Sequence, residues 1–347
     1  MKKNYTSAGY IMVLTITMVA VLTTLITYMV TRVQTYYPAS KHAQANMQAH
    51  LLALGGVQIG MAQLFDFIME KESKEQGAKT EKKANPADQW KLFLEKFLPK
   101  LNVWQTFDLK RNIEGIDGTI KICLGSEEGK LDINQLWDFK NNSFFFEKDE
   151  NKKKLYEELF NRMNKLGKAS DLFASFQKFF KNRGYLMNDV SELLLIKEYK
   201  VFVENLFYEP DKKEPLIYLT DIFTIWTGKK TIDPWLFSAS WQNILELKHE
   251  KKKDLKEVLK QFKPTIKWST EWDKTLALIY EKNLNTLPKN IDSLFADTFE
   301  PKIFSVLCQG IFEKTTSNLL AIIELTKTRT QDSEQKIEVK IRKLYRL

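Results

Sequence analysis

The chain has 347 residues, and its 53 Lys and Arg against 44 Asp and Glu give a formal net charge of +9. Hydrophobic residues make up 44% and charged residues 28%, a balance typical of a folded protein and unlike that of a disordered chain. Two cysteines are too few for a disulfide-dense scaffold or a cysteine-rich zinc module.

An uncharged, mostly apolar segment lies near the N-terminus, between Asn4 and Thr31. Residues 10–30 within it are enough to cross a hydrocarbon core of about 30 Å as a helix. The alternative is a cleaved secretory signal, whose apolar stretch is about 7–15 residues long and ends in a small-x-small site. This segment is longer and runs into Arg32 without such a site. We therefore expect a transmembrane helix.

The helical spacing of apolar residues continues beyond this segment, to about residue 69. We expect one helix over 10–69, with Pro38 as the point where it would bend. Its second half is amphipathic and rich in good helix formers, so we expect it to pack on a soluble body as a stalk. The expected packing stripe consists of Leu51, Leu54, Met61 and Phe65.

The rest of the chain predicts an α+β fold with an antiparallel sheet. A charged loop over 70–87 precedes a short helix over 90–98, which Pro99 ends. Period-two alternation predicts one early strand and three late ones, at 119–124, 302–308, 319–326 and 336–345. Between them the chain is mostly helical over 142–295, with candidate helices at 155–166, 172–180, 189–206, 236–247 and 272–282.

Motifs of known catalytic sites are absent from the sequence, which has no Gly-x-Ser-x-Gly, phosphate loop, His-Glu-x-x-His or Cys-x-x-Cys. A metal site needs at least three convergent ligands, and the histidines are too few and too scattered to supply them. They are His42, His50 and His249. The acidic residues Glu127, Glu128 and Asp132 do not have the spacing of a calcium loop, so we interpret them as a solvent-exposed turn.

Two further features each have two interpretations. Cys123 and Cys308 both fall on expected strands, where two free buried thiols are favoured over a disulfide between neighbouring strands. Basic runs at 71–83 and 248–253 alternate with acidic residues and lack interleaved aromatic residues. Solvated helix faces are therefore favoured over a nucleic-acid surface.

The first nine residues form a short basic segment that ends in Ala8-Gly9, directly before the apolar helix. This arrangement resembles a class III prepilin leader, which a prepilin peptidase removes after the glycine. The resemblance implies cleavage between Gly9 and Tyr10. Prepilin-like proteins usually carry Glu at the fifth mature position, where this chain has Leu14. That departure is typical of one family, the minor pseudopilin K of the type II secretion system.

Three later segments resemble that family in the same order along the chain. Gly129–Leu136 is similar to its Gly-x-Ile/Leu-Asn-Leu-Asn-x-Leu segment, and Val190–Ile196 to its Val-Asp-Glu-Leu-x-x-Val segment. Thr231–Trp235 followed by Asn243–Leu245 resembles a degenerate Ile-Asn-x-Asn-x-Ala-x-x-x-x-Leu segment. The family usually has an acidic turn in its helical insertion, whereas residues 173–180 contain no carboxylate.

The resemblance implies a pseudopilin fold, in which the long N-terminal helix packs on the antiparallel sheet and a large helical insertion follows. It divides the chain into a leader (1–9), a transmembrane and stalk helix (10–69), a first part of the body (70–139), a helical insertion (140–295) and closing strands (296–347). Family members can bind calcium, but this sequence offers no ligand set, so we expect no cofactor and leave calcium open.

The implied function is that of a non-enzymatic minor pseudopilin, which caps the pseudopilus tip and supports protein export across the outer membrane. The implied partners are the minor pseudopilins I and J, the prepilin peptidase and inner-membrane lipid, with the body in the periplasm and no nucleic acid. The expected interface with partner helices comprises Leu14, Ala43, Met47 and His50. The alternative is a single-pass, membrane-anchored helical binding module unrelated to pili. The sequence contains no motif that supports a membrane-anchored hydrolase.

The leader gives the first testable prediction. We expect the protein extracted from membranes of its native host to begin at Tyr10, which N-terminal sequencing or intact mass will show. Gly9→Val should block the cut, because the peptidase of this family accepts little beyond glycine. A wild-type protein that keeps Met1, or that begins after Thr31, would contradict the pseudopilin interpretation.

Overall fold

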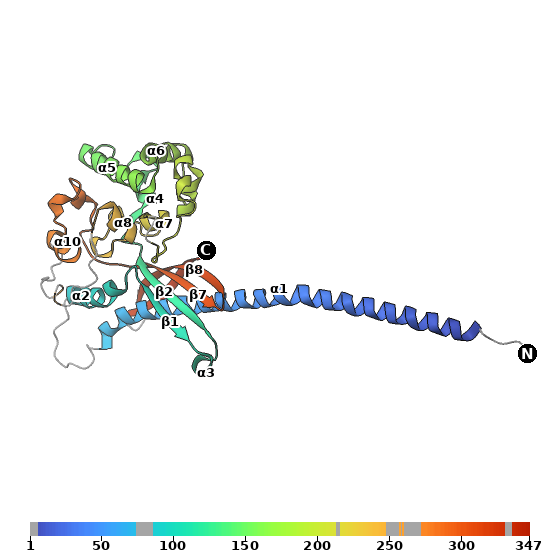
Figure 1. The fold of residues 1–347 in the computed structure, drawn as a ribbon. Coiled ribbons are helices and arrows are strands. Elements are labelled where there is room, and N and C mark those ends of the chain that lie inside the picture. Colours follow the sequence, from blue (N-terminus) through green and yellow to red (C-terminus); the bar gives the residue numbers. More distant parts are fainter. Residues whose placement is uncertain are drawn as a thin grey trace, which may run out of the picture.

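The computed structural model describes residues 6–73, 86–212, 216–247, 257, 259, 272–329 and 335–347. Its first element is the helix α1 (Thr6–Ser73), which projects far from the body (Figure 1). The expected single helix is thus confirmed, and it continues through Pro38 without a break. Among the described residues α1 is the one helix long and apolar enough to cross a membrane.

Threonine hydroxyls in the apolar half of α1 are paired with the helix itself. Thr23 donates to the carbonyl oxygen of Val19 at 2.7 Å, and Thr27 donates to that of Thr23 at 2.8 Å. Such i to i−4 bonds satisfy a hydroxyl where neither water nor another side chain is at hand. These polar residues are therefore compatible with a helix surrounded by lipid.

The body is built on a five-stranded antiparallel sheet in the order β1-β2-β7-β8-β9. These strands are β1 (Trp104–Leu109), β2 (Gly118–Ser126), β7 (Ile303–Phe312), β8 (Thr315–Arg329) and β9 (Gln335–Arg346). The four expected strands are confirmed, but β1 was not expected. The half-buried Phe107 and Leu109 alternate with the exposed Thr106 and Asp108, but Trp104 is out of phase with them, so the two-residue period covers only part of the strand.

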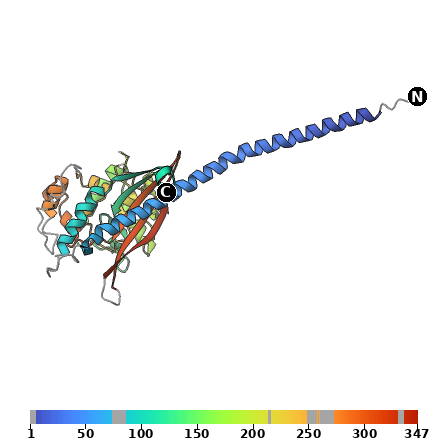
Figure 2. The ribbon, with the colours of Figure 1, turned by 90° about the horizontal axis from the view of Figure 1, so that it is seen from below.

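The second half of α1 lies across one face of this sheet, against β2, β7 and β8 (Figure 2). Its buried residues include Ala45, Ala49, Leu52, Ala53, Gly56, Val57, Gly60 and Leu64. The expected packing stripe is therefore confirmed for Leu54, Met61 and Phe65, which pack against the core, and wrong for Leu51. Leu51 is 51% exposed, while Leu54, Met61 and Phe65 are half-buried.

Small residues explain why the packing face differs from the expected one. A Cβ atom added to Gly56 would lie 2.9 Å from Cγ2 of Ile120, and one on Gly60 would lie 2.5 Å from Cγ1 of Val306. A Cβ on Gly310 of β7 would collide with the α1 backbone at Ala49 and Ala53. Helix and sheet approach so closely that the glycines, and not the largest apolar side chains, determine the contact.

A helical insertion occupies the chain between β2 and β7 and lies on the other side of the sheet from α1 (Figure 1). Its longer elements are α5 (Glu150–Gly167), α6 (Leu172–Arg183), η2 (Val190–Leu195), η3 (Lys197–Phe202), α8 (Ala239–Ile244) and α10 (Trp272–Tyr280). Shorter ones are α4 (Ile133–Leu136), α7 (Leu219–Ile222), η4 (Pro234–Leu236), η6 (Leu284–Thr286) and η7 (Ile291–Leu294). Two small sheets pair β3 (Leu131–Asp132) with β6 (Phe223–Thr224), and β4 (Trp137–Asp138) with β5 (Ser143–Phe144). The expected helix over 189–206 is two 3-10 helices instead.

Three further elements lie close to the sheet. The helix α2 (Pro86–Phe97) continues into η1 (Leu98–Lys100), and α3 (Arg111–Glu114) connects β1 to β2. Phe93 and Phe97 of α2 pack on Phe304 of β7, with ring centroids 5.9 and 5.3 Å away. The expected short helix before Pro99 is thus confirmed, and it covers one end of the sheet.

The two cysteines point to opposite faces of the sheet. Cys123 of β2 is opposite Leu307 of β7, and Cys308 is opposite Ile122, so the two thiols belong to adjacent, oppositely facing positions. Both cysteines are free and buried. The disulfide interpretation is therefore excluded. The basic runs at 71–83 and 248–253, with His249, lie outside the residues whose side chains the structure describes.

The close contact predicts opposite effects for two neighbouring Gly→Ala substitutions in α1. Gly55→Ala has room, since the added Cβ would be 3.8 Å from Ile120, and the gain in helix propensity should raise the free energy of unfolding by up to about 1 kcal/mol. Gly60→Ala should lower it by about 1–2 kcal/mol, because overpacking of about 1–3 kcal/mol outweighs that gain. Denaturation of both variants in detergent measures the difference, and equal effects would contradict the contact.

Candidate functional site

The outward face of α1 carries an apolar strip that the body leaves uncovered. Ala43 and Met47 are exposed, Met47 by 65%, and they lie four residues apart on the side away from the sheet. Leu51 continues the same line one turn further. We call Ala43, Met47 and Leu51 the outer strip. A soluble domain gains nothing by exposing such side chains next to a buried face, so the outer strip is a candidate contact surface.

The other expected interface residues lie elsewhere. Leu14 is 53% exposed in the apolar half of α1, roughly 43 Å along the helix axis from Ala43. His50 is half-buried, with Nδ1 3.4 Å from the hydroxyl of Ser317 in β8, so the body already contacts it. Tyr10 is exposed within α1. Leu51 was not among the residues predicted for the partner interface, because a large apolar side chain was expected to pack on the body of this chain.

A second notable feature is a buried polar junction between the sheet and the insertion. Glu127 and Glu128 are each 2% exposed and Asp132 is 1% exposed, so our interpretation of these residues as a solvent-exposed turn is wrong. They follow β2 directly and carry the chain into the insertion. Their burial depends on residues distant in sequence, which local spacing does not reveal.

Glu127 and Lys130 form a buried ion pair at the start of the junction. The Lys130 Nζ donates to Oε1 of Glu127 at 2.5 Å, and the Thr224 hydroxyl donates to Oε2 at 2.6 Å. Because Thr224 belongs to β6, this carboxylate joins the end of β2 to the insertion. Both of its oxygens are bonded, which offsets the cost of its burial.

Glu128 joins the junction to the beginning of β7. Its Oε1 accepts the backbone N–H groups of Lys302 at 2.7 Å and of Ile303 at 3.1 Å. Its own carbonyl accepts the N–H of Asp233 at 2.8 Å. Burial raises the pKa of Glu128, and the Lys229 ammonium 4.0 Å away opposes that rise. One residue therefore connects β2, β7 and the insertion.

Asp132 and Gly129 complete the junction. Asp132 caps α4 by accepting the N–H of Asn134 at 3.0 Å, and its other oxygen accepts the N–H of Gly228 at 2.8 Å. A Cβ at Gly129 would overlap the carbonyl of Leu236, so no larger residue fits there. Burial raises the pKa of Asp132.

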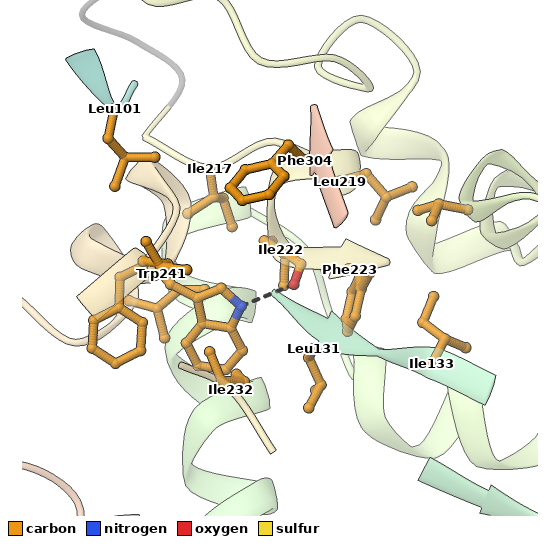
Figure 3. Close-up of a cluster of buried hydrophobic side chains, with 14 of the residues drawn as sticks. Leu101, Leu131, Ile133, Ile217, Leu219, Ile222, Phe223, Ile232, Trp241 and Phe304 are labelled. Carbon is orange, nitrogen blue, oxygen red and sulfur yellow. Dashed lines mark hydrogen bonds between the residues drawn. The ribbon is translucent and has the colours of Figure 1, made fainter. Parts of the chain in front are cut away.

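A cluster of buried apolar side chains lies in the same region of the chain (Figure 3). Leu131 and Ile133, on either side of Asp132, are buried next to Phe223 of the paired strand. The Trp241 indole N–H donates to the carbonyl of Ile222 at 2.8 Å. Desolvation in these dry surroundings is the main cause of the raised pKa values of Glu128 and Asp132.

The segments that resemble the pseudopilin K family meet at this junction. Gly129–Leu136 contains Asp132 and Asn134, and the Asn134 side chain accepts the N–H of Met187 at 2.8 Å, just before Val190–Ile196. Thr231–Trp235 contributes Asp233, whose carboxyl accepts the N–H of Trp235 at 3.0 Å. In the first and last of these segments, side-chain oxygens thus accept N–H groups of the chain's own backbone.

Because these side chains bond to the protein itself, we interpret the junction as a structural feature. Among the described residues, no group of three or more His, Cys, Asp or Glu side chains is placed to hold a metal ion. The junction acids accept hydrogen bonds from the protein itself.

The comparisons with known proteins add a structural likeness. No protein-family model and no curated protein sequence matches this chain. The structure is similar to a chain in the crystal structure of the GspK-GspI-GspJ complex from the type 2 secretion system of enterotoxigenic Escherichia coli. The identity is 11%, the match covers 89% of this chain and 99% of the other, and the TM-score is 0.44. At that TM-score, function has to be argued from this chain's own residues.

Asp233 makes stability depend on pH. Burial raises its pKa from 3.8 to about 8. Between these values the folded protein binds a proton that the unfolded chain releases, so the free energy of unfolding falls as pH rises, by up to about 1.4 kcal/mol per pH unit. Asp233→Asn keeps the oxygen that bonds Trp235 and should make the decline from pH 5 to 8 shallower.

Denaturation of the full chain in detergent at pH 5, 6, 7 and 8 measures this effect. Asp297→Asn, on the surface, is the matched control and should keep the wild-type slope. An Asp233→Asn slope equal to the wild-type slope would contradict the assignment.

Proposed function

We propose that this protein is a minor pseudopilin of a type II secretion system that acts as a structural component and not as an enzyme. Its apolar half of α1 anchors the precursor in the inner membrane, with the body in the periplasm. After removal of the leader, α1 packs beside the helices of the minor pseudopilins I and J at the pseudopilus tip. The assembly supports protein export across the outer membrane.

The division of α1 into two faces is the observation that carries this proposal. One face packs on the sheet through Gly56 and Gly60, and the opposite face exposes the outer strip. A helix that only anchored the body would need no apolar residues on its solvent side. Lipid and a neighbouring helix are both apolar surroundings for residues 10–30, so the exchange between them costs little.

The position of the insertion supports a place at the tip. It lies on the side of the sheet away from α1 (Figure 1), and the outer strip is exposed. A mass of this size above the sheet hinders the stacking of a further subunit. Leu14 also fits a position at the tip. Prepilin-like proteins usually have a Glu at this position, and its carboxylate would neutralise the free N-terminal amine of a neighbouring subunit. The last subunit has no such neighbour, so an apolar residue is suitable there.

Met47→Glu tests this proposal. The side chain is exposed in the chain itself, so the body should fold normally. In the assembly the added carboxylate would be buried between helices without a partner charge, at a cost of several kcal/mol. We expect co-purification with the minor pseudopilins I and J from membranes to fall strongly.

Leu195→Glu is the matched control, since Leu195 is 72% exposed on the insertion, away from α1. It should leave the association at its wild-type level. Equal association of the Met47→Glu variant and the wild type, or a wild-type protein without any pseudopilin partner, would favour the single-pass binding module instead.

A further inference from the structure

The tyrosines of α1 bracket a segment of membrane thickness. Tyr10 and Tyr28 are exposed by 72% and 57%, and about 27 Å of helix separates them. No charged residue lies between them. A hydrocarbon core is about 30 Å thick, and tyrosine is enriched at both of its boundaries with water. Tyr10 and Tyr28 therefore match the two levels at which a bilayer changes from apolar to polar.

Arg32 lies one turn beyond Tyr28, about 6 Å along the axis, where the headgroups of such a bilayer would be. Its guanidinium carbon is 4.9 Å from the ring centroid of Tyr28 and 5.9 Å from that of Tyr36. The two rings hold the guanidinium by cation–π contact, while its planar fork of N–H donors suits a phosphate. We call Tyr28, Arg32 and Tyr36 the collar.

The charge of α1 indicates which ligand the collar would take. The sequence has no acidic residue before Asp66, so α1 itself offers Arg32 no counter-ion within reach. Arg32 and Lys41 are the Lys and Arg residues between the apolar segment and the body. An anionic surface is the complement of this arrangement, and a bilayer presents a layer of phosphates at the level of Arg32.

We propose that the collar binds the phosphate of a phospholipid headgroup and thereby fixes the level of α1 in the membrane. The proposal rests on the membrane anchoring proposed above. This contact also sets the distance between the membrane and the body. Ala45 is the first buried residue among those of α1 whose burial is described, and it lies about 20 Å along the axis beyond Arg32. Residues 33–44, here called the neck, are exposed throughout and stand between headgroups and body.

Solid-state NMR measures the contact directly. The full chain, with the guanidinium carbons of arginine labelled with carbon-13, is placed in vesicles of phosphatidylethanolamine with a minor share of phosphatidylglycerol. Carbon–phosphorus dephasing should be present in the wild type and lost in Arg32→Lys, which keeps the positive charge. The other arginines are all in the body, from Arg111 onward. Dephasing that is equal in the two proteins would overturn the proposal.

A second arm separates lipid from free phosphate. In a phosphorus-free detergent with added inorganic phosphate, the dephasing should disappear, since the anion is no longer held at the level of the collar. Dephasing that persists there would assign the site to a free anion and overturn the lipid proposal.

Accessibility to a water-soluble maleimide tests the level of the helix. In vesicles, Tyr37→Cys should react and Met29→Cys should be protected, while the native cysteines are buried. Adding Arg32→Gln should raise the reactivity at position 29. If position 29 stays equally protected after Arg32→Gln, the proposal that the collar fixes the level of α1 is overturned, while the membrane anchoring still holds. Rapid reaction at both positions in the protein with Arg32 would show that α1 is not inserted, and would overturn the anchoring as well.

Discussion

The structure depends on the close approach of the α1 backbone to one face of the sheet. Gly310 of β7 provides the space, because any side chain there would collide with α1 at Ala49 and Ala53. Gly56 and Gly60 provide the same space from the helix side. Small residues on both surfaces fix the rotation of α1 about its own axis. That rotation in turn decides which residues of α1 face away from the sheet, and Met47 is one of them.

The insertion is attached by a different kind of interaction. Buried acids accept backbone N–H groups from segments far apart in the sequence, as Glu128 does from Lys302 and Ile303. Removing such a carboxylate would leave buried N–H groups without partners, which costs more than the net value of the bonds. Polar bonding at the junction therefore orients the insertion on the sheet, while apolar packing around Phe223 and Trp241 keeps water out. The sheet and the insertion leave the outer strip of α1 exposed.

The sequence predicts the elements that have strong periodicity. The long helix and the strands at 119–124 and 302–308 follow from patterns of 3.6 and 2 residues, which burial on one face imposes. It does not predict the centre of the packing face of α1, because Leu51 is favoured by its size while Gly56 decides the contact by lacking a side chain. Nor does it predict the burial of Glu127, whose partner Thr224 is about 100 residues away. Local spacing carries no information about such contacts.

Hydrogen–deuterium exchange along α1, in the full chain held in lipid vesicles, tests the central claim most directly. Amides of residues 49–64 should exchange as slowly as those of β7, because the contact at Gly310 has to open before they are exposed. Amides of the neck, residues 33–44, should exchange many times faster, since this stretch of helix is exposed on all sides. Equal exchange in the two stretches would show that α1 is not held against the sheet, and would contradict the account.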